Sequence, residues 1–310
     1  MSILVSDVSK RYGAQPALSQ VSFSIRKGEI VGFLGPNGAG KSTMMKIITG
    51  YLPPASGQVS VCGFDIATDG LASRRKIGYL PEHNPLYTDM YVREYLAFIA
   101  ELYGLNRVRQ RVEEMIDTVG LTQEAHKKIE ELSKGYRQRV GLAQAMIHDP
   151  EVLILDEPTS GLDPNQLAEI RDLIVRIGQE KTVMLSTHIM QEVEAICSRT
   201  IIINKGQVVA DRPTTELRTF GAGDSYELNV EFSGPVNQAQ LLQLTGVLHV
   251  RATGTHGWTI EVSNAHDIRP ELGRLAAERS LNILALARSE HRLEAVFKEL
   301  TNSRQNPARG

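Results

Sequence analysis

The sequence predicts an α/β fold organised around a phosphate-binding loop, followed by a smaller α+β unit. The first observation is the stretch Gly35–Thr43, which fits G-x-x-x-x-G-K-[ST] and has apolar runs on both sides. The second is a helical pattern over about 91–148, inserted between alternating strand and helix patterns. The third is the glycine-rich stretch 221–224, beyond which a second set of strands and helices begins.

The chain opens with Ile3–Val8 and Val21–Ile25, which alternate apolar and polar residues as half-buried strands do. Turn residues at Gly13–Pro16 separate them. Tyr12 stands at this turn. It can be an ordinary packed tyrosine, or its ring can stack on a nucleotide base, because every base has a π-face. The sequence leaves both interpretations open.

The phosphate-binding loop follows the apolar run Ile30–Leu34, which predicts a buried strand, and leads into a helix over Met44–Ile48. Its glycines let successive backbone N–H groups point to one place, where the helix N-terminus adds positive potential. We expect Lys41 to contact the β- and γ-phosphates of a nucleotide and the Ser42 hydroxyl to reach Mg²⁺. The predicted nucleotide-binding residues are Tyr12, Gly35, Pro36, Asn37, Gly38, Ala39, Gly40, Lys41, Ser42 and Thr43.

The helical block comes after predicted strands at Val59–Val61 and Lys76–Leu80 and extends from Tyr91 to about Met146. Gly104 and Gly120 are predicted helix C-terminal caps within it. Two apolar stripes at helical spacing precede these glycines, formed by Val92, Tyr95, Leu96, Ile99 and Leu102, and by Val108, Val112, Met115, Ile116 and Val119.

Strand patterning returns at Val152–Leu155, Thr182–Leu185 and Thr200–Ile203, with helical stretches between, which predicts a mostly parallel sheet. The first of these strands ends in Asp156 and Glu157. At the carboxyl end of a parallel strand, Asp156 can contribute to a Mg²⁺ site and Glu157 can polarise a water against the γ-phosphate. A strand running into a solvated acidic turn is the plain alternative.

Three other stretches begin helices or end a strand. Leu132–Tyr136 opens a helix in which Ser133 would be the N-cap, and the exposed backbone N–H groups there could hold an anion. Asp163 is also a predicted N-cap, with Pro164 at the first helical position. His188 follows a strand and can donate to phosphate charge. Ordinary capping and a structural histidine are adequate explanations of these residues taken singly.

The unit beyond 221–224 occupies 225–302 and is predicted to contain strand, helix, strand, strand, helix and strand, the order of a ferredoxin-like fold. A further helix is predicted at Leu293–Leu300, and 303–310 is a polar tail. The six elements of the ferredoxin-like order are predicted, in chain order, at Tyr226–Phe232, Val236–Leu244, Val247–Ala252, Trp258–Val262, Glu271–Arg279 and Ile283–Ala287.

Composition argues against several classes of protein. A net charge of −2 gives no basic field, so nucleic acid is not expected as a partner. No apolar run approaches the length of about 18 residues that spans a bilayer, and the N-terminus does not read as a signal peptide. Cys62 and Cys197 are far apart, which fits buried thiols in a reducing compartment better than a disulfide or zinc site.

Taken together, the motifs occur in the order of an ABC transporter ATP-binding subunit, a family that residues 2–217 resemble. The five that agree are Gly35–Thr43, Leu132–Tyr136, the strand ending in Asp156-Glu157, Ser160–Asp163 and His188. The resemblance implies an ABC cassette over 1–220: a RecA-like core, an antiparallel β part and a helical insertion at 91–148. It also implies binding of ATP and Mg²⁺, ATP hydrolysis, and a head-to-tail dimer with a second copy of the chain.

The resemblance assigns roles to individual residues. Lys134 and Tyr136 depart from the Ser-Gly-Gly-Gln that usually follows the signature leucine, whereas Ser133 and Gly135 are retained. The resemblance implies a trans signature at Ser133, Lys134, Gly135 and Tyr136, of which Ser133 and Gly135 face the γ-phosphate bound by the opposite subunit. It also implies adenine contact at Tyr12, the dimer seam at Asp163, catalysis at Glu157 and γ-phosphate sensing at His188.

Glu82 stands where the family usually carries a glutamine, so the resemblance implies metal contacts from Ser42, Glu82 and Asp156. Glu82 and the C-terminal unit resemble the ABC-2 exporter group, and the run Pro81–Tyr87 looks most like the gliding-motility-associated ATP-binding subunits. The implied function is ATP-driven export through a separate ABC-2-type membrane permease. The chain would then be cytoplasmic and peripheral on the inner face of the membrane.

Rival functions stay open. A soluble ABC-type ATPase acting on a ribosome or DNA usually carries two cassettes or a long coiled coil, and this chain has neither pattern. A P-loop kinase or switch GTPase is disfavoured by Glu157 and by the signature Ser133–Gly135. The C-terminal unit could sense a ligand, but nothing polar and convergent stands out there, which favours a structural or dimer-contact role.

Overall fold

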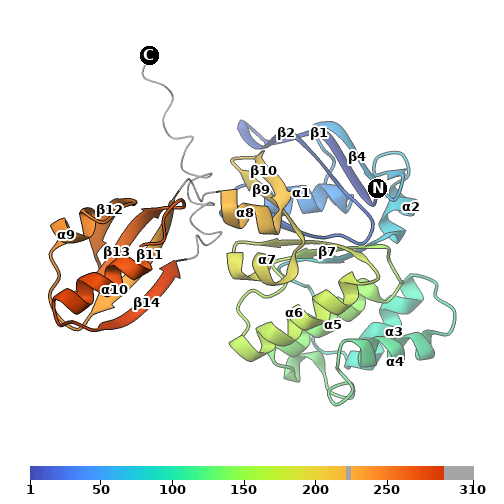
Figure 1. The fold of residues 1–310 in the computed structure, drawn as a ribbon. Helices are drawn as coiled ribbons and strands as arrows, with labels where there is room; N and C mark the ends of the chain where they lie inside the picture. The colour runs from blue at the N-terminus through green and yellow to red at the C-terminus, as the bar shows by residue number, and fades with distance from the viewer. Residues whose placement is uncertain (221–224, 290–310) are drawn as a thin grey trace. The chain divides into compact units, whose positions relative to one another are not determined.

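The computed structural model describes residues 1–220 and 225–289 (Figure 1). Its contacts divide the chain into two compact units, Met1–Thr214 and Thr215–Gly310, and each is described by itself. The predicted linker 221–224, the predicted helix Leu293–Leu300 and the tail 303–310 lie outside the described residues.

An antiparallel sheet in the first unit has the strand order β2-β1-β4-β5. β1 and β2 are longer than predicted. Their paired ends form an exposed ribbon, and exposed strand residues need not alternate between apolar and polar, so the sequence pattern does not reveal them. Tyr12 pairs with Gln15, so only Gly13 and Ala14 form the turn. The strands are β1 (Ile3–Tyr12), β2 (Gln15–Ile25), β4 (Ser56–Val61) and β5 (Phe64–Asp65).

A second sheet has the order β10-β9-β3-β8-β7-β6. All of its neighbouring strands are parallel except β10, which returns antiparallel to β9 after the turn Lys205–Gly206. The predicted, mostly parallel sheet is therefore confirmed. The strands are β3 (Ile30–Leu34), β6 (Ile77–Leu80), β7 (Val152–Asp156), β8 (Thr182–Thr187), β9 (Arg199–Asn204) and β10 (Gln207–Pro213).

Helix α1 (Lys41–Ile48) packs into a core that both sheets share. Met44 and Ile48 are fully buried there, and the rings of Phe23 and Phe33 join β2 to β3 with centroids 5.6 Å apart. In this core α1 packs against β2, β4 and β7. The helices α2 (Gly70–Arg75) and α8 (Thr214–Phe220) are not predicted from the sequence, since stretches this short show no period. The helices α6 (Pro164–Gly178) and α7 (Met190–Ile196) separate β7, β8 and β9.

The predicted helical block contains α3 (Val92–Leu102), α4 (Val108–Thr118) and α5 (Lys134–Met146), which lie together in Figure 1. Gly104 and Gly120 have φ of 68° and 69°, as C-terminal caps require. Of the first predicted stripe, Leu96 is fully buried but Leu102 is 68% exposed, so that stripe is wrong at its C-terminal end. Leu102 instead borders an open, partly apolar cavity.

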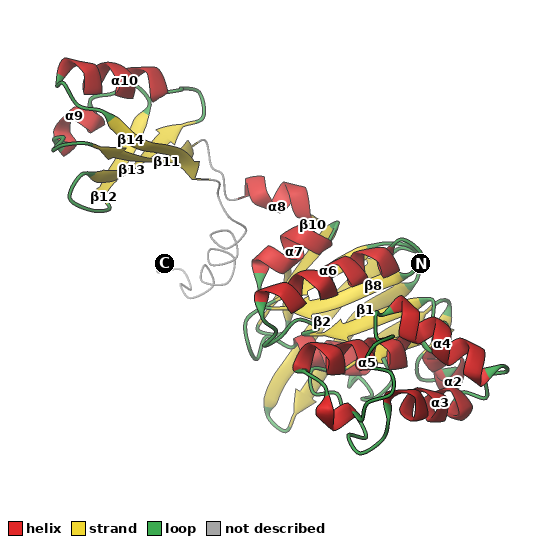
Figure 2. Ribbon diagram, turned by 90° about the horizontal axis from the view of Figure 1, so that it is seen from below, coloured by secondary structure: helices red, strands yellow, loops and turns green. Residues whose placement is uncertain are grey.

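The second unit has the sheet order β12-β13-β11-β14 with every neighbour antiparallel, which is the ferredoxin-like arrangement. Its helices and sheet are separate layers in Figure 2. The helix predicted from Val236 begins later because Asn237 is the N-cap and accepts from the Ala239 N–H. The elements are β11 (Ser225–Phe232), α9 (Gln238–Leu242), β12 (Val247–Ala252), β13 (Gly257–Ser263), α10 (Arg269–Glu278) and β14 (Ile283–Ser289).

Over residues 1–220 and 225–289, none of the helices combines the length and the apolar character needed to cross a bilayer.

Candidate nucleotide-binding and catalytic site

A cavity of about 400 Å³ opens at the start of α1. It brings together the ends of β3, β6, β7 and β8, which are far apart in the sequence. Most of the predicted phosphate-binding loop lines it, with side chains from three other predicted site positions. The lining residues are Ala17, Pro36, Asn37, Gly38, Gly40, Lys41, Ser42, Thr43, Glu82, Glu157 and His188.

The loop backbone has the shape that an anion site needs. Gly40 has φ of 109°, and a Cβ there would lie 2.7 Å from the Ala17 carbonyl oxygen. A Cβ at Gly35 would lie 2.5 Å from the Ile203 carbonyl oxygen. Both positions therefore require glycine. No side chain caps the N-terminus of α1, so its first N–H groups can donate to phosphate oxygens.

Lys41 lies in the cavity wall and is only 7% exposed. Its Nζ donates to the Gly35 carbonyl over 2.7 Å and lies 3.8 Å from Oε1 of Glu157. Burial lowers the pKa of Lys41, whereas Glu157, Asp156 and Glu82 act in the opposite direction. The ammonium group is therefore held among carboxylates at a point where phosphate charge can replace them.

Glu157 follows β7 in a left-handed backbone conformation, with φ of 50°. Non-glycine residues adopt it rarely, and such positions concentrate at functional sites. The Glu157 N–H donates to the carbonyl oxygen and to Oγ of Ser186, which holds the conformation. Oε2 of Glu157 lies 2.9 Å from Nδ1 of His188. Burial raises the pKa of Glu157, although His188 and Lys41 both oppose that change.

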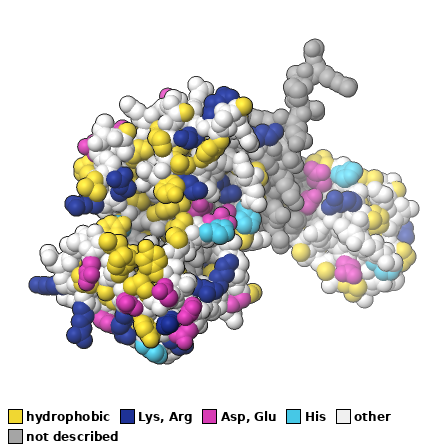
Figure 3. Space-filling model, turned by 180° about the vertical axis from the view of Figure 1, so that it is seen from behind, with side chains coloured by type: hydrophobic (Ala, Val, Ile, Leu, Met, Phe, Trp, Pro, Cys, Tyr) yellow, Lys and Arg dark blue, Asp and Glu magenta, His cyan; other side chains and the backbone are white. Residues whose placement is uncertain are grey.

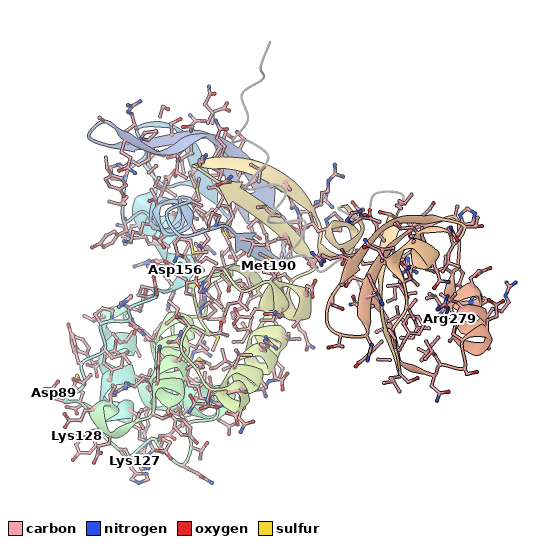
Figure 4. All side chains as sticks on the ribbon, turned by 90° about the vertical axis from the view of Figure 1, so that its left-hand side faces the viewer. Asp89, Lys127, Lys128, Asp156, Met190 and Arg279 are labelled. Carbon is pink, nitrogen blue, oxygen red and sulfur yellow. The ribbon has the colours of Figure 1, made fainter. Side chains whose placement is uncertain are left out.

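The three predicted metal ligands lie at different depths. Ser42 and Glu82 line the cavity, whereas Asp156 is 2% exposed and accepts a hydrogen bond from the Ser186 hydroxyl. Figure 4 labels Asp156 in the interior of the first unit. No group of three His, Cys, Asp or Glu side chains in the described chain could by itself hold a metal. The residues fit Mg²⁺, which binds proteins through one or two carboxylates and completes its shell with phosphate oxygens and water.

Tyr12 is not brought to the cavity. It sits at the tip of the β1–β2 ribbon, is 51% exposed and is absent from the cavity lining. Its predicted contact with adenine therefore stays a prediction.

The predicted signature lies at the N-terminus of α5, outside this cavity. Ser133 caps the helix, since its Oγ accepts from the Tyr136 N–H over 3.3 Å. Gly135 is buried beneath α6, where an added Cβ would lie 2.6 Å from Oε1 of Gln166. Asp163 caps α6 by accepting from the Asn165 and Gln166 N–H groups, each over 3.0 Å. The signature and the Asp163 loop are thus neighbours on the surface.

Comparisons with known proteins agree with this geometry. A profile of the ABC transporter family matches residues 18–160. The linearmycin resistance ATP-binding protein LnrL of Bacillus subtilis is 35% identical over 95% of this chain and 96% of its own length. The chain belongs to the ABC transporter ATP-binding proteins.

Two further relatives of this ABC ATP-binding subunit extend the comparison. The bacitracin transport ATP-binding protein BcrA of Bacillus licheniformis is 31% identical, with 96% of each chain covered. A solved dimeric ATP-binding cassette, in a post-hydrolysis state with ADP and Pi, shares 28% identity at a TM-score of 0.62, covering 68% of this chain and 98% of that one. The predicted fold is confirmed, and the subunit is an ATPase that binds ATP with Mg²⁺.

Sequence reasoning missed several buried polar groups of this ABC subunit. Ser186 bridges Asp156 to the Glu157 backbone, and Glu192 in α7 accepts from two threonine hydroxyls. The signal was present as a polar pair, Ser186 and Thr187, at the end of an apolar strand. Glu192 gave no signal, because a glutamate in the first turn of a helix is ordinarily solvated.

A second cavity, of about 670 Å³ and more apolar than the first, lies between the helical block, the end of α1 and strand β6. We call this cavity the apolar cleft. The Tyr103 and His148 rings stack at its wall with centroids 4.0 Å apart. Tyr51 and Leu102 border it at 74% and 68% exposure, and Figure 3 shows hydrophobic side chains gathered on one face of the first unit. The remaining lining residues are Thr49, Gly50, Arg74, Ile77, Tyr79, Ile99, Gln144 and Ala145.

The C-terminal unit has an apolar core but carries a polar surface cavity that its sequence does not indicate. A cavity of about 510 Å³ is lined by Tyr226, Arg269 and Arg288, which come from β11, α10 and β14. The expectation of nothing convergent is wrong, because these residues are distant in the sequence. Arg269 already pairs with Asp267 over 2.7 Å, and the Arg288 guanidinium lies 4.2 Å from the Tyr226 ring centroid. Internal contacts thus already engage both guanidinium groups.

Proposed function

We propose that this ATPase drives export through a separate ABC-2-type membrane permease. The observation that carries the catalytic part is the Glu157 carboxyl group, which lies between His188 and Lys41 beside the phosphate-binding loop. Export is supported by the relatives, whose names refer to linearmycin resistance and bacitracin transport. Residues 1–220 would be the ATP-binding domain that hydrolyses ATP, and residues 225–302 would be an accessory domain.

In the proposed mechanism, Glu157 accepts the proton of the attacking water as that oxygen bonds to the γ-phosphorus and the ADP oxygen leaves. His188 donates from Nδ1 to Glu157 and so aims its carboxylate into the cavity. His188 would also sense the γ-phosphate, because its side chain lines the same cavity. Lys41 and the N–H groups of the loop hold the phosphates. Mg²⁺, held through Ser42, Glu82 and Asp156, would supply neutralising charge.

The site would be completed by a second copy of the chain. Ser133, Lys134, Tyr136 and Asp163 are exposed on the surface and do not line the chain's own cavity. A helix N-terminus that is exposed in this way can neutralise phosphate held by another subunit. ATP binding would thus join two chains head to tail.

The permease would dock on the apolar cleft and on the neighbouring loop Glu82–Met90. Glu82 lines the nucleotide cavity, and the Met90 carbonyl accepts from the Ile129 N–H in the helical block. The loop therefore links the two regions directly. Bound to its permease, the chain would lie on the inner face of the membrane.

Co-purification tests this function. The tagged full chain would be isolated from detergent-solubilised membranes of its own cells. A stoichiometric polytopic membrane protein that stimulates ATP hydrolysis after reconstitution is expected. Ribosomes or DNA as the stoichiometric partner would support the soluble-ATPase alternative instead. The resemblance of Pro81–Tyr87 to gliding-motility subunits stays a prediction, and the identity of that permease tests it.

A further inference from the structure

A carboxyl group with no role in the mechanism above is buried beside the catalytic residues. Glu192 lies in the first turn of α7, two residues after Met190, which Figure 4 labels. Its relative exposure is 0%. Its Oε1 accepts from the Thr159 hydroxyl over 2.5 Å and its Oε2 accepts from the Thr187 hydroxyl over 2.8 Å. A fully buried carboxyl group is costly unless its oxygens are bonded, as both are here.

The two threonines belong to the two loops that carry the catalytic pair. Thr187 ends β8 and directly precedes His188. Its Oγ1 also accepts from the Ile189 N–H over 3.0 Å, so it fixes the backbone on both sides of the histidine. Thr159 lies two residues after Glu157, in a turn closed by the bond from the Ser160 N–H to the Glu157 carbonyl. Through these two hydrogen bonds, Glu192 connects the loop that follows Glu157 to the loop that carries His188.

The alignment of Glu157 with His188 depends on both loops. Ser186 holds the Glu157 backbone on one side, and Thr159 restrains the turn that follows it. The carboxyl-to-imidazole distance of 2.9 Å spans the two loops. A displacement of about 1 Å at reacting groups can cost about 10²-fold in rate. A residue that fixes both loops can therefore control turnover without touching nucleotide.

We propose that Glu192 is a positioning residue for ATP hydrolysis, which acts by clamping Thr159 and Thr187 so that Glu157 and His188 keep their mutual geometry. The proposal rests on the proposed catalytic role of Glu157. It assigns the buried carboxyl group to turnover and not to nucleotide affinity, since Glu192 does not line the cavity.

The test uses the purified full chain and measures kcat, KM, ATP affinity and Tm. Glu192→Ala removes both acceptors and is expected to lower kcat about 100-fold, with KM and ATP affinity within about twofold. Glu192→Gln keeps one acceptor oxygen and the side-chain shape, so it should restore kcat to within about 10-fold of wild type. Thr187→Val removes one hydroxyl with little change of volume and should lower kcat by an intermediate factor. Gln191→Ala, at the exposed neighbouring position, is the matched control.

A double-mutant cycle separates positioning from general destabilisation. In a Glu157→Gln background, single-turnover hydrolysis should change less than about twofold on adding Glu192→Ala, because Glu192 acts through Glu157. Wild-type kcat in Glu192→Ala, equal losses in kcat and ATP affinity, or an undiminished effect in the double mutant would each overturn the inference. Wild-type activity in Glu157→Gln alone would instead remove the catalytic assignment on which it rests.

Discussion

Nδ1 of His188 lies 2.9 Å from Oε2 of Glu157, while Nζ of Lys41 lies 3.8 Å from the other oxygen of the same carboxyl group. The carboxyl group is thus held between a cation and an imidazole at the wall of the cavity of about 400 Å³. Burial raises the pKa of Glu157 and its two partners lower it, so its charge depends on neighbours that line the same cavity. If Glu157 is the catalytic base as proposed, phosphate that displaces Lys41 or His188 would change the charge on the base, and hydrolysis would be coupled to phosphate binding.

Ser133→Ala tests whether the signature acts on a second copy. Ser133 does not line the cavity of its own chain, so ATP affinity of the monomeric chain should stay within about twofold. ATP-dependent dimerisation and hydrolysis should fall at least about 10-fold, because the N-terminus of α5 loses its cap and its phosphate contact. Fluorescent-nucleotide titration and light scattering measure the two effects. A matching loss of monomer affinity would argue for a role within the same chain.

Glu82 offers a test of the metal contact. It lines the cavity with Ser42, at a position where a glutamine would supply a neutral oxygen. A carboxylate attracts Mg²⁺ and repels phosphate, and at similar distances these two interactions largely offset each other. Glu82→Gln should therefore stay within about 10-fold of wild type in rate, with a weaker dependence on Mg²⁺. Glu82→Ala should lose more. If alanine matches wild type at limiting Mg²⁺, Glu82 does not contact the metal.

Leu102→Glu tests the proposed docking cleft. Leu102 is exposed at the rim, so a charge there should spare basal ATP hydrolysis and protein stability while disrupting an apolar contact. Permease-stimulated hydrolysis in proteoliposomes should fall at least about 10-fold. Leu284→Glu is the matched control, since Leu284 is similarly exposed in the C-terminal unit. Equal loss in the control would move the docking surface to that unit. Asp89→Lys tests the neighbouring loop Glu82–Met90 in the same assay. Figure 4 labels Asp89 together with Lys127 and Lys128.

His148 should make stability depend on pH. Its Nε2 donates to the Ile77 carbonyl over 3.0 Å, and burial lowers the pKa of the ring below its usual 6.5. The unfolded chain then binds a proton more readily than the folded one as pH falls below about 6.5. The contribution of the neutral ring is therefore complete above this pH and is lost as pH falls through the folded pKa. Urea unfolding from pH 7.5 to 5 should show a steeper loss for wild type than for His148→Phe. Parallel curves would contradict this.

Much of the fold and the loop was predictable from local pattern, and the exceptions have physical causes. A few consecutive residues are enough to predict the buried strand Ile30–Leu34 from its apolar run. They are also enough to predict the helix caps at Gly104 and Gly120, because glycine adopts the positive φ that a C-terminal cap needs. Leu102 could not be placed, because an apolar residue that borders a cleft looks like a core residue in sequence. Glu192 was missed because its partners, Thr159 and Thr187, come from other elements. Long-range hydrogen bonds leave no periodic trace.

Size-exclusion chromatography with light scattering on Glu157→Gln, with and without ATP and Mg²⁺, tests the central claim most directly. The amide preserves the shape of the side chain but cannot accept the water's proton, so ATP should bind normally while turnover falls about 10²–10⁴-fold. The variant is expected to be a monomer without nucleotide and, with ATP and Mg²⁺, a stable dimer that retains unhydrolysed ATP. A variant that hydrolyses ATP at the wild-type rate, or that stays monomeric while saturated with ATP, would contradict it.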